Sequence, residues 1–332
     1  MNTASGQLVT VFGGSGFVGR HVVRALARRG YRIRVAVRRP DLAHFLQPLG
    51  GVGQIHAVQA NLRNAQSVEQ AMAGSYAVIN LVGILTESGK QRFSTVQSEG
   101  AAHVARAARD LGIQHFVHMS ALGADLESRS AYARSKAEGE RAVKAALKDA
   151  IILRPSIIFG PEDGFFNRFA ELATTLPVLP LIGGGETLFQ PVFVGDVAEV
   201  VARAVDGTLK AGTTYELGGA DAHRFVDLIQ FILRTIDHAP MLVPLPFKIA
   251  RLQAGLMEFA KYASFGLLPE EFLMTRDQVT LLEQDNVVSD KAKAEGRTLE
   301  GLGITPETIE AVVPTYLWRF LKGGQFASGR YA

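Results

Sequence analysis

A glycine run near the amino terminus has the spacing of a loop that binds a diphosphate. It reads Gly13-Gly14-Ser15-Gly16-Phe17-Val18-Gly19 and lies between an apolar stretch at 8–12 and an amphipathic stretch at 18–27. Glycine allows the tight turn and lets backbone N–H groups approach a pyrophosphate, and the positive end of the following helix attracts the phosphates. No Gly-Lys-Ser/Thr follows, which excludes a Walker loop. We predict a dinucleotide site with cofactor contacts at Gly13, Ser15, Gly16, Phe17, Val18 and Gly19.

The end of the second apolar stretch indicates which dinucleotide binds. An NAD site places Asp or Glu there, about 20 residues after the glycine run, to bind the ribose 2′-OH. This chain has Arg38 and Arg39 instead, with no carboxylate before Asp41. Two guanidinium groups suit a 2′-phosphate, although they also suit a solvated surface. We therefore favour NADP(H) over NAD(H).

A tyrosine and a lysine further along have the spacing of one helix face. Tyr132 and Lys136 are four residues apart at the start of a helical pattern. That spacing places both side chains on one helix face, one turn apart. The alternative is a chance match in which Lys136 is a solvated helix lysine.

Short apolar runs that alternate with amphipathic segments must position these residues. Strands separated by helices of this length predict βαβ units and a parallel sheet that is buried on both faces. The expected fold is α/β, a Rossmann-like doubly wound parallel sheet. The predicted strands are 8–12, 33–37, 55–59, 77–82, 115–119 and 150–153, and the predicted helices are 18–27, 67–73, 96–111 and 133–147.

The rhythm changes near residue 160, where prolines and a triple glycine at 183–185 mark loops. We expect a nucleotide-binding domain at 1–160, with returning elements at about 190–237. Those elements include a helix at 196–205 and a strand at 214–217. Residues 161–332 are expected to form a smaller, interleaved and mostly helical subdomain.

Composition excludes several classes of protein. Apolar residues make up 47% of the 332 positions, charged residues 20%, and the net charge is only +3. These values argue against disorder and against a nucleic-acid partner. The chain has no cysteine, and His115 and His118 fall on opposite faces of a strand, so we expect no metal site and place both histidines at a strand end or the surface. Neither a leader nor a membrane span is apparent, and we expect a soluble, cytoplasmic protein.

The glycine run, taken together with Tyr132-Ala-Arg-Ser-Lys136, resembles the extended or atypical branch of the short-chain dehydrogenase/reductase superfamily. Asn61-Leu62 and Arg154-Pro155 resemble further motifs of that branch. The resemblance implies that Tyr132 is the general acid/base, that Lys136 lowers its pKa and holds the nicotinamide ribose, and that Ser120 polarises the substrate oxygen. The cofactor contacts that it further implies are Asn61 and Leu62 at the adenine, and Val82, Tyr132, Lys136 and Pro155 towards the nicotinamide.

Two departures weaken the case for catalysis. Gln97 stands where the superfamily usually has Asn, and the segment 80–85 after the fourth strand is bulkier than usual. A complete set of Ser120, Tyr132 and Lys136 therefore allows turnover but does not establish it.

A closer resemblance is to the NAD(P)H-binding accessory subunit of respiratory complex I, the alpha-subcomplex subunit nine family. It rests on the segments 118–124, 130–140, 157–163 and 190–194. The resemblance implies a bacterial relative that holds NADPH without turnover and contacts complex I subunits near the membrane. It would lie on the cytoplasmic face of the inner membrane. The alternative is a free-standing NAD(P)-dependent oxidoreductase, or a sugar-nucleotide epimerase or dehydratase, that uses Tyr132 and Lys136.

One stretch, 245–263, is amphipathic in an unusual way. As a helix from Phe247, it gathers its charges on one narrow face and leaves a wide apolar arc. Such an arc with net positive charge suits a membrane surface or an apolar partner. A helix that packs on its own subdomain is the alternative.

The basic residues between 160 and 240 argue mildly against the epimerase alternative. A sugar-nucleotide enzyme needs basic residues in this region to hold a second diphosphate, and here they are scattered rather than clustered.

Overall fold

The computed structural model describes residues 6–263 and 274–324, with side chains outside 259–263. The chain divides into two compact units. The first unit comprises residues 1–155, 194–217 and 289–304, and the second comprises 156–193, 218–288 and 305–332. Among the described residues, no helix is both long and apolar enough to cross a membrane.

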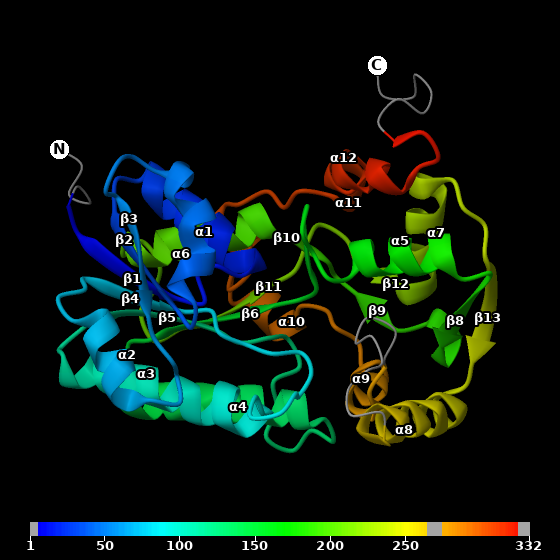
Figure 1. Ribbon diagram of the computed structural model, residues 1–332, viewed down its shortest axis with the longest axis horizontal. Coiled ribbons are helices and arrows are strands. Elements are labelled where there is room, and N and C mark those ends of the chain that lie inside the picture. Colours follow the sequence, from blue (N-terminus) through cyan, green and yellow to red (C-terminus); the bar gives the residue numbers. More distant parts are fainter. Residues whose placement is uncertain (1–5, 264–273, 325–332) are drawn as a thin grey trace. The chain divides into compact units, whose positions relative to one another are not determined.

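A seven-stranded parallel sheet forms the centre of the first unit (Figure 1). Its strand order is β11-β6-β5-β4-β1-β2-β3. The chain therefore leaves β1 in both directions, and β1 and β4 flank the point where the order reverses. In doubly wound sheets, ligands bind beside that point, outside the carboxyl ends of the strands. The strands are β1 Leu8–Phe12, β2 Arg32–Val37, β3 Ile55–Gln59, β4 Ala77–Asn80, β5 His115–Met119, β6 Ile151–Pro155 and β11 Thr214–Leu217.

Helices cover both faces of this sheet, which explains its continuous apolar strands. In Figure 1, α2, α3 and α4 lie on one face, and α1 and α6 lie together on the other. The packed interior beneath α2 and α3 includes Phe12, Val78, Val104 and Phe116. The helices are α1 Phe17–Arg28, α2 Ala65–Met72, α3 Glu99–Asp110, α4 Ala131–Ala146, α6 Val194–Val205 and α10 Asp290–Ala294. The predicted Rossmann-like fold is confirmed.

Two predicted boundaries shift for identifiable reasons. The strand expected to reach residue 82 ends at Asn80, because the Asn80 side chain accepts a hydrogen bond from the Val82 N–H at 3.2 Å and turns the chain. The helix expected from residue 96 begins with a π-helical turn at Ser94–Ser98, and regular α3 follows it. A π turn of this kind is common at functional sites.

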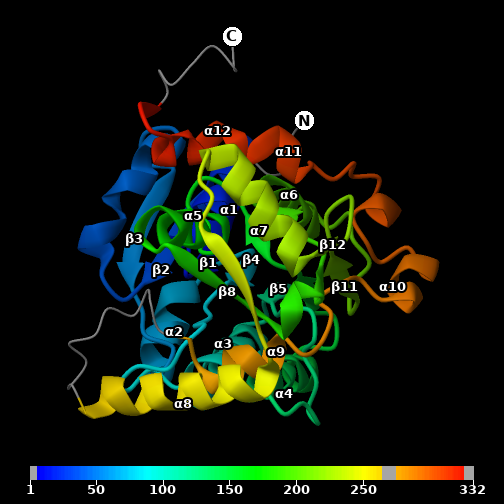
Figure 2. The same cartoon turned by 90° about the vertical axis from the view of Figure 1, so that its right-hand side faces the viewer.

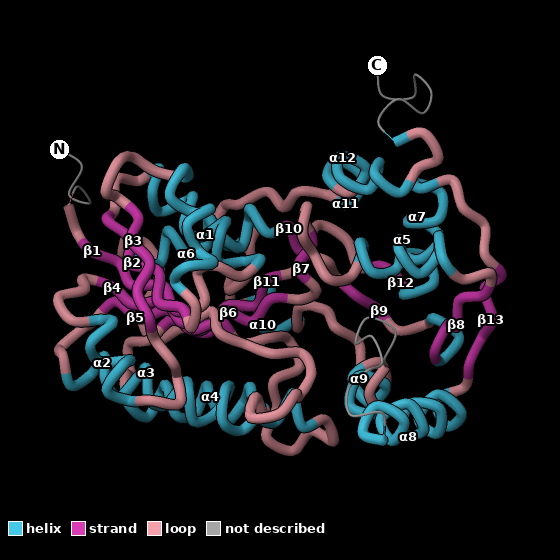
Figure 3. Tube along the Cα trace, viewed as in Figure 1, coloured by secondary structure: helices cyan, strands magenta, loops and turns pink. Residues whose placement is uncertain are grey.

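The second unit combines three two-stranded ribbons with helices (Figures 2 and 3). The ribbons pair β7 Ile158–Phe159 with β10 Val192–Phe193, β8 Val178–Ile182 with β13 Met241–Leu245, and β9 Leu188–Phe189 with β12 His223–Arg224. Its helices are α5 Phe166–Thr175, α7 Phe225–Ile236, α8 Phe247–Ala263, α9 Arg276–Leu281, α11 Ile309–Val312 and α12 Pro314–Leu317.

A buried carboxylate ties this unit together. Asp163 accepts hydrogen bonds from the backbone N–H groups of Phe165 and Phe166 at 2.9 and 2.6 Å, at the start of α5. It also accepts from the Tyr316 hydroxyl at 2.5 Å, from a segment 153 residues away in the chain. Burial raises the pKa of both Asp163 and Tyr316. This hydrogen bond therefore joins the segment around Tyr316 to the start of α5 within the second unit.

Candidate functional site

The glycine turn at residues 13–19 is built for close approach by a ligand. Gly13 has a φ of +78°, which side chains rarely adopt. A Cβ atom on Gly19 would lie 2.4 Å from the Gly13 carbonyl oxygen, so the turn and α1 can pack this closely only with glycine there. Gly16 is the N-cap of α1 and has an extended conformation. Because glycine has no side chain, no side-chain hydrogen bond caps the first N–H groups of the helix. Such a helix end suits a pyrophosphate.

Ser15, Phe17 and Val18 are half-buried at this turn, and Gly16 is exposed. Val82 lies against it, because a Cβ atom on Gly13 would be 3.2 Å from the Val82 Cγ2. The structure thus brings the turn and Val82 together at the carboxyl ends of β1 and β4.

Arg38 and Arg39 follow β2 directly, and both are exposed. The Gly13 N–H donates to the Ala36 carbonyl at 3.2 Å, which ties the end of β2 to the glycine turn. Arg39 forms an ion pair with Asp41 at 2.7 Å. Because that pair is solvent-exposed, it holds Arg39 only weakly and leaves it able to meet a second anion.

Asn61 and Leu62 follow β3, at the same edge of the sheet. The Asn61 side chain accepts from the Arg63 N–H at 3.1 Å. Leu62 is buried and packs with the apolar interior beneath α3. Pro155 ends β6 and is buried, and its carbonyl accepts from the Leu122 N–H at 2.9 Å.

Ser120, Tyr132 and Lys136 come from β5 and α4. Ser120 follows β5 and is 3% exposed, and its hydroxyl has no hydrogen-bond partner among the described residues. Lys136 is buried, and its ammonium donates to the Met119 carbonyl at 3.2 Å. The Lys136 Nζ lies 5.8 Å from the centre of the Tyr132 ring. A buried hydroxyl without a partner is costly, so Ser120 is suited to meet a ligand oxygen.

The surroundings shift the ionisation of both α4 side chains. Burial raises the pKa of the Tyr132 phenol to about 12. Burial lowers the pKa of the Lys136 ammonium to about 8, although the nearby Glu140 carboxylate opposes that shift. At neutral pH, the phenol therefore carries its proton and is ready to donate it.

Sequence reasoning interpreted Gln97 only as a departure from the superfamily pattern. In the structure, its amide donates to the Ile84 carbonyl at 2.6 Å and accepts from the Ser135 hydroxyl at 3.1 Å. Gln97 thus ties the segment after β4 to α4, and the π turn at Ser94–Ser98 carries it. Glutamine is longer than the asparagine usual in the superfamily, and from the π turn its amide bridges Ile84 and Ser135.

The expectation that His118 lies at a strand end or the surface is wrong. His118 is 3% exposed, and its Nδ1 lies 3.3 Å from the Asn80 amide nitrogen. It shares a face of β5 with buried Phe116, since side chains alternate along a strand. Burial, followed by the Lys136 charge, lowers the pKa of His118 to about 3, so the ring is neutral. In the described ranges, no three His, Asp or Glu side chains gather closely enough for a metal ion.

A buried ion pair fixes α4 against the sheet. The Arg154 guanidinium on β6 donates to both oxygens of Glu140 on α4, each at 2.7 Å. The Glu140 side chain is 5% exposed and that of Arg154 is 26% exposed. Glu140 lies one turn beyond Lys136, so the pair positions the helix that carries both candidate catalytic side chains.

Comparison with known proteins agrees with this geometry. The family model described as "NAD dependent epimerase/dehydratase family" matches residues 9–218. The chain is 34% identical to the mitochondrial NADH dehydrogenase (ubiquinone) 1 alpha subcomplex subunit 9 of Arabidopsis thaliana, over 97% of this chain and 80% of that protein. It is 37% identical to a ceramide reductase of Caulobacter vibrioides, over 55% of this chain and 56% of that protein.

A solved structure shares the fold at low sequence identity. The NADPH-dependent quinone oxidoreductase of Escherichia coli, complexed with NADPH, superimposes with a TM-score of 0.70 at 19% identity. The match covers 93% of this chain and 99% of that one. The fold, the matched family model and the similarity to the Arabidopsis protein over 97% of this chain all point to the same family. This chain belongs to the NAD dependent epimerase/dehydratase family and, within it, to the family of the alpha subcomplex subunit 9 of NADH dehydrogenase.

Proposed function

We propose that this protein is an NADP(H)-binding accessory or assembly subunit of respiratory complex I, the NADH:ubiquinone oxidoreductase. The observation that carries the proposal is the extent of the similarity to the complex I subunit, which runs through both units of the chain. A likeness confined to the nucleotide-binding unit would be expected of any member of the wider family. The chain would then associate peripherally with the cytoplasmic face of the inner membrane.

The proposed cofactor is NADP(H), which supplies a hydride donor or acceptor when it is bound. The glycine turn offers backbone N–H groups to the pyrophosphate, and Arg38 and Arg39 offer guanidinium groups to the 2′-phosphate. A ligand that binds only the folded state stabilises it by mass action, so a resident nucleotide serves an assembly subunit without turnover. The remaining proposed contacts are Asn61 and Leu62 at the adenine, and Val82, Tyr132, Lys136 and Pro155 at the nicotinamide end.

A second candidate function is an NAD(P)-dependent reductase. It is supported by the buried Ser120 hydroxyl, which has no hydrogen-bond partner in the described part of the chain, and by the protonated Tyr132 phenol and the buried Lys136 from adjoining elements. The identity to the ceramide reductase over half of the chain points the same way. Hydride transfer to a carbonyl would then draw its proton from Tyr132, with Ser120 positioned to hold the carbonyl oxygen.

Lys136 makes NADPH binding pH-dependent. Burial lowers the pKa of its ammonium to about 8 in the free protein. A ribose oxygen that accepts a hydrogen bond from the ammonium raises this pKa in the complex. The affinity for NADPH is therefore constant below the pKa of the free protein and falls as the pH rises above that value, by up to about tenfold per pH unit. Calorimetric titration with NADPH between about pH 7 and about pH 9.5 measures this fall.

The Lys136→Met variant should bind NADPH more weakly at neutral pH and lack the alkaline decline. Tyr132→Phe should keep both the affinity and the decline, because the pKa of this phenol lies near 12, above the range titrated. Parallel profiles for the wild type and Lys136→Met would show that this ammonium does not contact the nucleotide.

The helix α8 supplies a surface for the proposed partner. Its small residues Ala250 and Ala254 are buried and pack near Ile182 and Val279 of the same unit. Phe247, at the start of the helix, also packs against that interior, whereas three larger apolar residues further along point away from it. They are exposed at 53% for Ile249, 64% for Leu252 and 63% for Leu256.

This stripe has the spacing of one helix face, i, i+3 and i+7. The ribbon that precedes α8 carries exposed apolar residues of its own, since Met241 on β13 is 67% exposed and its register partner Val178 on β8 is 42% exposed. Figure 2 shows α8 following directly from β13. We expect the stripe to contact an apolar complex I subunit or the membrane surface beside it.

Charging the stripe should release the protein from complex I. The change is Leu252→Glu with Leu256→Glu, which alters exposed side chains and leaves the Ala250 side of the helix intact. On a native gel of gently solubilised membranes, the wild type should migrate with NADH dehydrogenase activity and the variant should migrate alone. NADPH affinity should stay at the wild-type value, because none of the proposed nucleotide contacts lies on α8.

Leu111→Glu, which charges a leucine of the first unit that is 38% exposed, serves as the matched control and should still comigrate. A wild-type chain that never comigrates with the activity would contradict the proposed function itself. A double variant that comigrates normally would contradict only the assignment of the stripe.

A further inference from the structure

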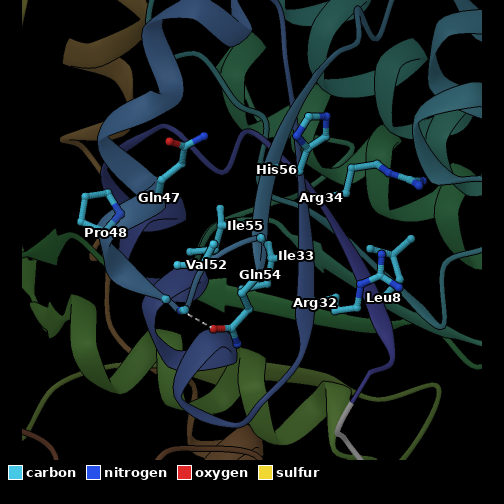
Figure 4. Close-up of a pocket in the computed structure, with 13 residues that line it drawn as sticks. Leu8, Arg32, Ile33, Arg34, Gln47, Pro48, Val52, Gln54, Ile55 and His56 are labelled. Atoms are coloured by element: carbon cyan, nitrogen blue, oxygen red, sulfur yellow. Dashed lines mark hydrogen bonds between the residues drawn. The ribbon is translucent and has the colours of Figure 1, made fainter.

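A cavity of about 710 Å³ lies in the first unit, away from the glycine turn. It is lined at the starts of three neighbouring strands, by Leu8 of β1, Arg32 and Arg34 of β2 and His56 of β3 (Figure 4). The loop at residues 50–54 also lines it. No step of the proposed function uses this cavity.

The cavity and the nucleotide site are at opposite edges of one sheet. The strands run parallel, so all their amino ends meet at one edge and all their carboxyl ends at the other. The glycine turn follows the carboxyl end of β1, whereas Leu8 begins that strand. A strand of five residues spans roughly 16 Å. A ligand of the cavity therefore does not compete with NADP(H) for the same atoms.

Arg34 is held in place as a donor. Its Nη1 donates to the carbonyl oxygens of Ala71 and Ala73, both at 2.9 Å, where α2 ends. These bonds fix the guanidinium plane, and no hydrogen bond joins its Nε or Nη2 to another described residue. A guanidinium that is fixed on one side keeps its other donors for a bidentate partner at little entropic cost.

Two further basic side chains share the face that carries Arg34. His56 is its register partner on β3, and Arg32 lies two positions earlier on β2. Figure 4 shows Arg32, Arg34 and His56 along the same side of these strands. In the described part of the chain, no Asp or Glu forms an ion pair with any of the three. Burial, followed by the positive charge of Arg32, lowers the pKa of Arg34.

The opposite wall is partly apolar and is stiffened by a glutamine. Pro48 and Val52 contribute apolar surface there, with Val52 fully exposed at the tip of the loop, whereas Leu8 adds apolar surface beside Arg32, its register partner. Gln54 accepts from the Gly51 N–H at 2.7 Å and donates to the carbonyls of Ala27 and Tyr31 at 2.8 and 2.9 Å. The loop is thereby pinned to the segment between α1 and β2.

We propose that this cavity is a second ligand site, for a phosphate monoester that carries an apolar group. Two guanidinium groups and an imidazole match the charge and the three oxygens of a phosphate dianion, where a carboxylate would need only one guanidinium. The apolar wall takes the group attached to the phosphate. That ligand is either a soluble phosphate ester or the headgroup of an acidic lipid, since both present this chemistry.

The test uses 1-naphthyl phosphate as the probe and the full chain saturated with NADPH. Calorimetry should show one binding site per chain, and 1-naphthol, which lacks the phosphate, should not bind. Arg32→Gln and Arg34→Gln should each weaken binding by about tenfold or more. Arg32 is exposed, so its substitution tests the site even where Arg34→Gln disturbs the end of α2. Arg141→Gln, at an exposed arginine of α4, is the matched control and should bind as the wild type does.

Binding that NADPH abolishes, or that both arginine variants retain in full, would overturn the proposal. Vesicles of phosphatidylcholine with and without phosphatidic acid separate the two sources. Sedimentation that requires both phosphatidic acid and Arg32 assigns the site to a lipid headgroup. Probe binding without sedimentation assigns it to a soluble phosphate ester.

Discussion

Replacing Arg38 with Asp and Arg39 with Ala should move the nucleotide preference from NADP(H) towards NAD(H) by about a hundredfold. The new carboxylate repels a 2′-phosphate and accepts a hydrogen bond from the 2′-OH of NAD(H). Both arginines follow β2 and are exposed, so solvent screening keeps the effect well below what a buried site would show. Titration of the purified variant with NADPH and with NADH measures the two affinities directly.

The single variant Arg39→Ala serves as a graded control. Arg39 already shares its charge with Asp41, so its loss should weaken NADPH binding less than the loss of Arg38 does. Unchanged affinities for both nucleotides in the double variant would show that the 2′-phosphate lies elsewhere.

Removing the Glu140 carboxylate should destabilise the protein by about 3 kcal/mol, because Glu140→Gln takes from the half-buried Arg154 guanidinium the carboxylate that it pairs with directly and leaves it only the weaker influence of Glu216 and Asp125. The two hydrogen bonds of 2.7 Å also hold α4, so NADPH affinity should fall as well. Urea unfolding followed by circular dichroism measures the change in the free energy of unfolding.

Glu69→Gln, at an exposed glutamate of α2, is the matched control and should change the free energy of unfolding by less than about 0.5 kcal/mol. Replacing both partners, as Glu140→Leu with Arg154→Met, should recover much of the loss, since the uncompensated charge is then absent. A loss below about 1 kcal/mol for Glu140→Gln would show that the pair does not anchor α4.

The central strands of the first unit's sheet could be predicted because they are buried on both faces. Stretches such as Leu8–Phe12 and Ile151–Pro155 are then nearly all apolar, and the sequence shows them without knowledge of their neighbours. The glycine turn could also be predicted, because its requirements are local to the chain. Gly13 and Gly19 are required by local geometry, a positive φ and a contact within the turn.

The polar residues around the site could not be placed from the sequence, since their partners are distant in the chain. His118 meets Asn80 from the next strand, and Gln97 meets Ser135 from α4. Nothing local distinguishes a buried histidine from a surface one. Its position inside an apolar strand, two residues after Phe116, was the available signal.

The second unit shows two further limits. Its ribbons are short, and β8 contains a proline, so pattern alone could not separate them from loops. The helix α8 was predicted correctly from Phe247, but its buried face was not. Small residues, Ala250 and Ala254, allow the close approach to Ile182 and Val279, and Ile249, Leu252 and Leu256 are left exposed.

We infer that this chain is a nucleotide-holding subunit of complex I. The most direct test is affinity purification of the tagged native protein from gently solubilised membranes, with any bound nucleotide extracted and identified. We expect complex I subunits in the eluate and NADPH that is released only on denaturation. A protein recovered alone from the soluble fraction, with NADP that exchanges freely, would contradict the claim and favour the reductase.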